Sequence, residues 1–216
     1  MEKLDSRKTI DLFSDHCTDR PELRTDLLFG PACGKMFGIL EALTPIGEKT
    51  QLYAFSGSYN GVWVLPGWAP PLFDLAVFTM LTHPVEVQIK ALGEQISSSS
   101  EQSAQLLKLR RDRRRLSGEL MGKIHRLYRV HNFRGESFAL QDAFLGDGNM
   151  PSGTGDCCAP KLIDLAARRG LRPISLAEFY WGREGAAGTR RHGLFYSACS
   201  SKCAPILGSM LCGCNG

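Results

Sequence analysis

The residues with the clearest chemical potential in this sequence are four cysteines in its last third. Cys157 and Cys158 follow the glycine-rich segment 146–155, and Cys199 and Cys203 follow Gly193. Each pair stands at the predicted start of a helix, where backbone N–H groups point outward and lower the pKa of a thiol. We therefore predict that these thiols act as thiolates towards one metal ion.

The cysteine count allows two interpretations. Eight cysteines in 216 residues would suit a disulfide framework in a small secreted domain. The amino-terminal residues 1–13 lack the apolar run of a signal peptide, and half of the cysteines cluster at two helix starts. This pattern favours metal binding or free thiols over disulfides.

Two cysteine-bearing helices that follow one another across a strand are typical of zinc-dependent nucleobase deaminases. In that class a first helix brings His or Cys followed by a Glu proton carrier, and a second helix brings P-C-x-x-C. This sequence departs from the pattern at three points. Cys199 and Cys203 are separated by three residues with Ala198 in place of the proline, Pro160 and Lys161 stand where the Glu is expected, and the chain is expected to end before the last strands of such a sheet.

Two further residues are candidates for such a site. Glu178, on the predicted strand between the helices, is the best substitute proton carrier, and Asp156 is the other. His192 could complete a Cys3His zinc site with Cys157, Cys199 and Cys203, or it could be a surface histidine. Alternatively, Glu178 could have only a structural role and pair with a nearby arginine or with the helix that follows.

The surrounding pattern predicts the elements that would hold these residues. Residues 33–43 and 51–57 are apolar strands around a turn, which indicates an antiparallel hairpin. Asp156 is suited to be the N-cap of a helix that runs to Arg169, and residues 171–180 are typical of a strand. We expect an α/β fold, a small mixed sheet flanked by helices with a cytidine-deaminase-like outline.

The middle of the chain is a separate chemical feature. After Pro84 the sequence becomes helical, is interrupted by serines at 97–100, and continues with leucines three, four and seven residues apart. This pattern predicts a helical hairpin with an arginine-rich wet face that binds an RNA or DNA backbone; the alternative is a solvated helix face. The arginines are Arg110, Arg111, Arg113, Arg114 and Arg115.

Charge and composition limit the other possibilities. The formal net charge is +4, yet residues 108–129 alone hold nine Lys or Arg against two acidic residues, so the basic excess is local. The chain is 43% hydrophobic and 22% charged, and it contains no apolar run long enough to span a bilayer. We expect a cytoplasmic protein without a membrane partner or an organic cofactor.

Several stretches resemble a known family. GKMFGIL (34–40), PPLFD (70–74), GTGDCCAPKLIDLA (153–166) and HGLFYSACSSKCAPILGSML (192–211) look like the amino-terminal extension of bacterial RluA-type pseudouridine synthases, which modify tRNA and large-subunit rRNA. The resemblance covers most of residues 33–212. It implies that Cys157, Cys199 and Cys203 have counterparts in the family, whereas Cys158 is usually alanine there.

The resemblance also limits the expected activity. Those enzymes use an HRLD motif whose aspartate is the nucleophile, and the nearest match, His125-Arg126-Leu127-Tyr128, has a phenol in that place. We expect helix there, and a chain that ends where the catalytic domain would begin. Whether the chain is itself an enzyme stays open.

The sequence thus predicts three parts and two functions. The parts are residues 1–84 with the hairpin, a basic helical insertion at 85–131, and a cysteine-bearing helix-strand-helix at 132–216 that completes the fold. The first function is an RNA-binding, substrate-positioning domain for tRNA or rRNA that acts with a pseudouridine synthase catalytic domain in trans. The alternative is a zinc-dependent, deaminase-like hydrolase that uses Cys157, Cys199, Cys203 and Glu178.

Overall fold

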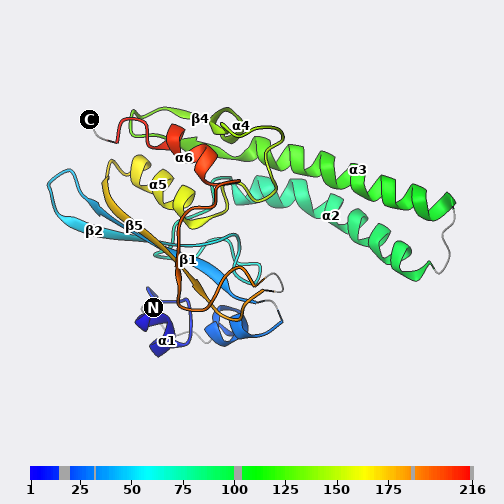
Figure 1. Ribbon diagram of the computed structural model, residues 1–216, viewed down its shortest axis with the longest axis horizontal. Coiled ribbons are helices and arrows are strands. Elements are labelled where there is room, and N and C mark those ends of the chain that lie inside the picture. The colour runs from blue at the N-terminus through cyan, green and yellow to red at the C-terminus, as the bar shows by residue number, and fades with distance from the viewer. Residues whose placement is uncertain (15–19, 32, 100–103, 186–187, 215–216) are drawn as a thin grey trace.

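The computed structural model describes residues 1–14, 20–31, 33–99, 104–185 and 188–214 (Figure 1). Its elements, in chain order, are α1 (Glu2–Arg7), two short 3-10 helices (Pro21–Leu23 and Thr25–Phe29), β1 (Lys35–Leu43), β2 (Lys49–Phe55), α2 (Leu75–Ser98), α3 (Ala104–Leu127), β3 (Arg129–His131), β4 (Ser137–Ala139), α4 (Leu140–Ala143), α5 (Cys158–Arg168), β5 (Arg172–Trp181), β6 (Phe195–Tyr196) and α6 (Ala204–Met210). The α/β class and the helical hairpin predicted from the sequence are confirmed.

A four-stranded sheet in the order β2-β1-β5-β6 forms the centre of the fold. Its three strand pairings are antiparallel, and an isolated parallel bridge joins Tyr53 to Trp68 beside β2. The predicted hairpin of β1 and β2 is confirmed, and so is the strand β5. β1 pairs with both β2 and β5, and β5 pairs with both β1 and β6, so β1 and β5 are the two interior strands of this sheet.

Each face of the sheet carries its own hydrophobic core. On one face, Met36 and Leu40 pack with Leu162 and Ala166 of α5. On the other face, Phe37 and Phe179 pack with the amino-terminal segment that holds α1. The molecule therefore has three layers: α5 with its neighbours above the sheet, the sheet itself, and the amino-terminal segment below it (Figure 1).

Gly38 of β1 brings α5 unusually close to the sheet. A Cβ at this position would lie 2.5 Å from the Cβ of Cys158 and 3.0 Å from Leu162 Cδ1. Gly38 pairs with Glu178 of β5, so the Glu178 side chain lies on the same face of the sheet as α5. The glycine thus sets the distance between the sheet and the first turn of α5.

We expect Gly38→Ala to lower the free energy of unfolding by about 1–3 kcal/mol, because the added methyl group must push α5 away from the sheet. Gly118→Ala in α3 is the matched control. A Cβ there meets nothing within 4 Å, so this substitution should raise the free energy of unfolding by about 0.5–1 kcal/mol. Denaturant unfolding of both variants measures the difference. A Gly38→Ala protein as stable as the parent would contradict the tight contact.

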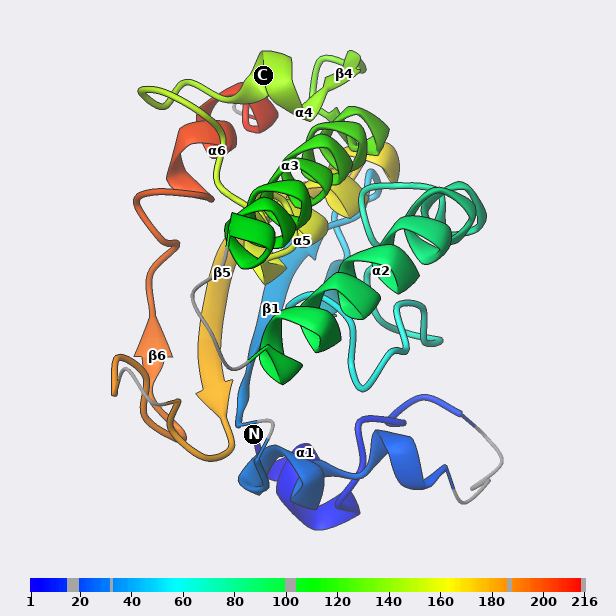
Figure 2. The same ribbon diagram turned by 90° about the vertical axis from the view of Figure 1, so that its right-hand side faces the viewer.

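The helical hairpin consists of α2 and α3, which extend from the sheet and α5 (Figures 1 and 2). Asp74 caps α2 by accepting a hydrogen bond from the Val77 N–H at 3.0 Å. The helix therefore begins at Leu75, and the predicted start after Pro84 was wrong: Pro84 lies inside α2. The sequence rule failed because a proline is more usual in the first turn of a helix than in its interior. Residues 100–103, which include part of the predicted serine hinge, lie outside the described residues.

Within the described part of the chain, no helix is both long enough and apolar enough to cross a membrane.

Candidate metal centre and basic helix

The first helix of the candidate centre, α5, begins after a glycine-rich loop. Gly153 and Gly155 have φ angles of 75° and 88°, in the left-handed region that glycine adopts without strain. The N-cap of α5 is Cys157, whose side chain makes no capping hydrogen bond. The loop thus delivers the Cys157 thiol to the open end of the helix, where unpaired N–H groups gather.

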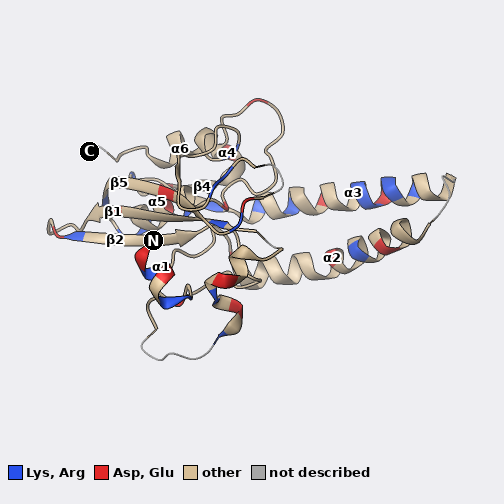
Figure 3. Ribbon diagram, turned by 60° about the horizontal axis from the view of Figure 1, so that its bottom comes forward, with Lys and Arg blue, Asp and Glu red and all other residues tan. Residues whose placement is uncertain are grey.

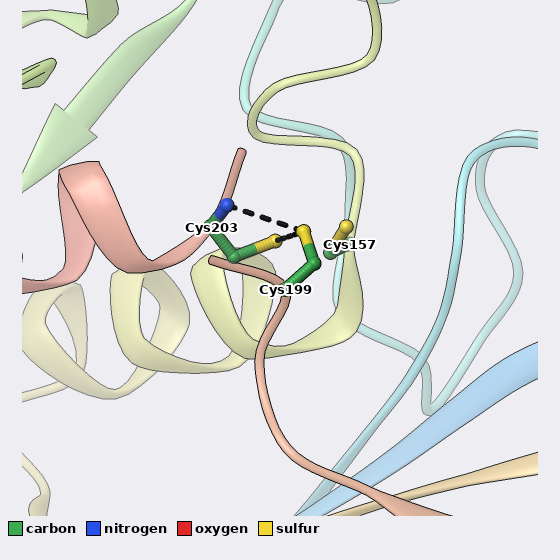
Figure 4. A group of neighbouring side chains, drawn as sticks. All are labelled: Cys157, Cys199 and Cys203. Atoms are coloured by element: carbon green, nitrogen blue, oxygen red, sulfur yellow. Dashed lines mark hydrogen bonds between the residues drawn. The ribbon is translucent and has the colours of Figure 1, made fainter. Parts of the chain in front are cut away.

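The second helix, α6, brings two more thiols to the same place. Cys203 is its N-cap, Pro205 lies in its first turn as predicted, and Cys199 precedes it by four residues. The Cys203 N–H donates to Cys199 Sγ at 3.4 Å, and the two sulfurs are 3.5 Å apart (Figure 4). The sulfurs of Cys157, Cys199 and Cys203 all lie within 4.8 Å of one another.

This spacing fits a metal ion held by thiolates. A tetrahedral site with metal–sulfur bonds of about 2.3 Å places its sulfurs about 3.8 Å apart, close to the observed separations. Cys203 is buried and the other two thiols are half-buried. The cluster could therefore hold a metal ion, and it contains three of the four thiols that the helix-start pattern predicts, without Cys158.

Hydrogen bonding within the cluster prepares one thiol to ionise first. The thiol of Cys203 interacts with Cys157, which lowers the pKa of Cys157 against the effect of burial. The same interaction raises the pKa of Cys203, because its proton is the one shared, and burial adds to the rise. Of these two thiols, Cys157 therefore ionises more readily, and a metal ion would have to displace the proton of Cys203.

Cys158 lies apart from the cluster although it is adjacent in sequence. Its thiol is fully buried beside Gly38 and donates to the Met36 carbonyl at 3.4 Å. Burial raises its pKa well above the ordinary value. Cys158 is thus a packing residue of the core, and the structure separates the two neighbouring cysteines that sequence spacing alone could not distinguish.

Glu178 is buried next to the start of α5. Its Oε1 accepts a hydrogen bond from the Ala159 N–H at 3.0 Å, so it satisfies one of the free donors of the helix. Burial raises the pKa of the carboxyl group, although the bond from Ala159 opposes this. Its charge raises the pKa of Cys157, but among the described residues the three thiols come together as potential metal ligands without Glu178.

His192 was predicted as a fourth ligand, and the structure places it elsewhere. Its Nδ1 accepts the Gly182 N–H at 3.1 Å, and its ring packs edge-on against Trp181 at 4.3 Å between ring centroids. Among the described residues, the three cysteines come together as potential metal ligands, and His192 is not part of that group. The turn after β5 holds the imidazole at the end of that strand, beyond Glu178.

Asp156 was predicted as the N-cap of α5, and it has a different role. Its Oδ1 accepts a hydrogen bond of 2.6 Å from the Tyr128 hydroxyl, which comes from the segment just after α3. Burial raises the pKa of Asp156, and the bond from Tyr128 opposes that shift. This long-range bond draws the side chain away from the helix end, so Cys157 takes the capping position.

Lys161 is a buried lysine to which no role was assigned from the sequence. Only 1% of its surface is exposed. Its Nζ donates to the carbonyls of Phe55 and Gly57, each at 3.0 Å, and lies 5.1 Å from the centroid of the Phe55 ring. Its burial could have been predicted from its position four residues before Leu165, because residues four apart lie on the same side of a helix.

Burial lowers the pKa of Lys161 from 10.5 to about 8. Between pH 8 and 10 the unfolded chain therefore binds more protons at this lysine than the folded chain, so the stability contributed here rises with pH. From pH 7.5 to 9.5 we expect the free energy of unfolding of the parent to rise by about 2 kcal/mol more than that of Lys161→Met. Urea unfolding at both pH values measures this gain, with exposed Lys90→Met as control. If the parent and Lys161→Met show the same pH dependence, the pKa of Lys161 is not lowered in the folded protein.

The predicted basic face of α3 is present. All five arginines are exposed, while Leu106 and Leu120 are buried. At 100° per residue, Arg110, Arg111, Arg114 and Arg115 lie within one arc of about 140° on the side away from the leucines. Figure 3 shows basic residues along the outer part of α3. Arg115 also forms an ion pair of 2.9 Å with Glu119.

Arg113 differs from the other four arginines. Its angular position lies on the leucine side of α3, and it lines a shallow groove with Glu86, Lys90 and Glu94 of α2. Its guanidinium group lies next to Gly93 of α2. The outward basic face is therefore formed by four arginines, and Arg113 belongs to the contact between the two helices.

Comparison of the chain with protein-family models, with curated proteins and with solved structures gave no match.

Proposed function

We propose that this chain is an RNA-binding and substrate-positioning domain of an RNA-modification protein related to the RluA-type pseudouridine synthases. The observation that carries the proposal is the outward arginine face of α3 on a hairpin that extends from the body of the molecule (Figure 3). A row of guanidinium groups at such a position suits the phosphates of a tRNA or rRNA strand.

The uridine chemistry itself would come from a catalytic domain in trans. At the HRLD-like position the chain has Tyr128, which is buried and bonded to Asp156, and a neutral phenol cannot replace a carboxylate nucleophile. The role of this domain would then be to hold the RNA and present it. Such a role needs affinity and orientation, and both follow from charged side chains on a rigid helix.

In this proposal the three-thiol cluster holds zinc and has a structural role. Zinc prefers thiolate ligands in tetrahedral sites and brings no redox chemistry of its own. Cys157 belongs to the start of α5, and Cys199 and Cys203 belong to the start of α6. One ion would therefore fix the short carboxyl-terminal helix against α5, where Ile206 and Met210 complete the core.

The test of the RNA-binding role is the affinity of the purified protein for single-stranded RNA at different salt concentrations. If three to four phosphates are neutralised, affinity should fall roughly 20- to 50-fold between 50 and 200 mM salt. Fluorescence anisotropy with a labelled oligonucleotide gives both the affinity and the slope. Affinity that is the same at both salt concentrations would exclude the basic face as the binding surface.

The position of Glu178 at the first turn of α5, the helix that Cys157 caps, favours a second candidate, a zinc-dependent, deaminase-like hydrolase. Its buried carboxyl group has a raised pKa, as a proton carrier requires. For this candidate, Glu178→Gln should abolish turnover of nucleobases or nucleosides by the zinc-loaded protein and leave the zinc content unchanged. The amide oxygen can still accept the Ala159 N–H, so the fold is retained. No turnover by the zinc-loaded parent would exclude this candidate.

A further inference from the structure

A small cavity lies at the base of the helical hairpin, where α2 and α3 meet the body. Its volume is about 110 Å³, and it is lined by residues from four parts of the chain. Trp63 comes from the segment after β2, Phe78 from the first turns of α2, His125 from the end of α3, and residues 152–154 and 156 from the loop before α5. None of these residues belongs to the three-thiol cluster.

His125 is the side chain in this cavity that needs a partner. The residue is 7% exposed, and its Nε2 is the one buried side-chain nitrogen or oxygen in the described residues without a hydrogen-bond partner. A buried polar atom that is left unpaired costs free energy, so its presence points to a ligand that supplies the missing bond. Burial also lowers the pKa of His125, which keeps the imidazole neutral, with one nitrogen as donor and the other as acceptor.

The other walls of the cavity combine a carboxylate with aromatic rings. Asp156 uses Oδ1 to accept the Tyr128 hydroxyl, and a carboxylate has further acceptor sites that this bond does not use. Trp63 and Phe78 stand edge to face, with 5.5 Å between their ring centroids. The cavity therefore offers apolar ring surfaces together with one strong acceptor and one imidazole.

The cavity continues the line of the arginine face. His125 is eleven residues after Arg114, which is about three full helical turns, so the two residues share one side of α3 at a separation of about 16 Å. Between them lie Gly118 and Gly122, where an added Cβ would meet nothing within 4 Å. A strand held along the arginine face would thus pass over an open stretch of helix towards the cavity.

We propose that this cavity binds the ring of a single unstacked pyrimidine from the RNA that α3 holds. The cavity, at about 110 Å³, is smaller than a cavity of about 150 Å³ that accepts benzene, so it can take at most one six-membered ring, edge first, and it is too small for a purine. The N–H edge of uracil or the amino group of cytosine can donate to Asp156, and the neighbouring ring acceptor can pair with the His125 imidazole. The source of the ring rests on the proposed RNA-binding function, whereas recognition of the ring itself does not.

Two variants test the cavity. His125→Phe keeps a ring of similar shape and removes both nitrogens. Ser152→Trp fills the cavity from its rim, where Ser152 is exposed, so it should not disturb the core. Circular dichroism of both variants confirms that they fold. If only one of them folds, that variant alone decides the result, because each blocks ring binding by a different route.

The probes are a decauridylate that carries 5-fluorouridine, and free 5-fluorouracil. We expect the parent protein to shift the fluorine resonance of both probes and both variants to leave it unshifted. Decauridylate affinity should fall roughly fivefold or more in the variants, because one stacked base is lost, while decaadenylate affinity stays within about twofold. A bound decauridylate with the same fluorine spectrum in parent and variants would overturn the pyrimidine pocket and leave the RNA-binding function standing.

The measurement with free 5-fluorouracil separates the two proposals when the protein does not bind RNA. If neither RNA binds the parent, the proposed RNA-binding function fails, and the pocket is then judged by free 5-fluorouracil alone. A shift that both variants abolish supports a pocket for free pyrimidines. The absence of a shift at millimolar 5-fluorouracil overturns the pocket as well.

Discussion

The triple variant Arg110→Gln, Arg111→Gln, Arg114→Gln should bind single-stranded RNA on the order of 10- to 100-fold more weakly than the parent at low salt. These three side chains are exposed on the outward arc of α3. Each arginine that leaves a phosphate should reduce the salt slope by about 0.7 to 1, so the slope should fall by about 2 to 3. Anisotropy titrations at several salt concentrations measure both effects.

A single pair of substitutions in the same segment provides the matched control. Arg113→Gln and Arg114→Gln remove the same charge from adjacent positions, but Arg113 faces the α2 groove and Arg114 faces outward. Arg114→Gln should therefore weaken RNA binding several times more than Arg113→Gln. If the two substitutions act equally, net charge rather than the outward face governs binding.

The triple variant also separates function from folding. Because the three arginines are exposed, the free energy of unfolding of the variant should equal that of the parent within about 0.5 kcal/mol. A variant that folds normally and binds RNA as tightly as the parent would refute the proposed role of α3. In that case, the basic residues would be no more than the solvated side of an amphipathic helix, which is the alternative that the sequence also allowed.

The parts of the fold that the sequence predicted are those with local periodicity. The leucine spacing of α3 places Leu106 and Leu120 in the buried stripe, and alternating strands around a short turn give the hairpin of β1 and β2. Thiols at the two helix starts were predictable as well, because a helix start has a local signal in its glycines and in Pro160 or Pro205, but this signal did not separate Cys157 from the adjacent Cys158.

The features that were missed depend on contacts between distant segments. Asp156 fits the N-cap rule locally, yet a bond to Tyr128, 28 residues earlier in the chain, overrides it. His192 has ligand chemistry, but the turn after β5 directs it to Gly182 and Trp181. The cavity around His125 is assembled from four separate segments, so no window of the sequence contains it.

Cys199→Ala and Cys203→Ala should each lose the zinc that the parent is expected to hold at about one ion per chain. Removing one of three clustered thiolates leaves too few ligands for a structural site. Because the ion would join α5 to α6, both variants should also unfold several kcal/mol more easily than the zinc-loaded parent. Mass spectrometry of the native protein and calorimetry measure the two quantities.

Two other cysteines serve as controls for the metal site. Cys33→Ser removes a thiol outside the cluster, and Cys158→Ala removes the neighbour of Cys157 that bonds to Met36 instead. Both variants should keep the zinc, although Cys158→Ala should lose some stability because its thiol fills the space beside Gly38. Zinc loss in Cys158→Ala with retention in Cys199→Ala would place the ion elsewhere.

A chelator distinguishes a metal-built site from a purely packed one. If zinc joins the two helix starts, chelation should lower the unfolding temperature of the parent to that of Cys203→Ala and leave the variant unchanged. Should the parent be free of metal when purified under reducing conditions without chelator, the pair Cys199 and Cys203, with sulfurs 3.5 Å apart, would act through packing or redox chemistry instead. The arginine face of α3 would then be tested independently, because α3 supplies none of the three thiols.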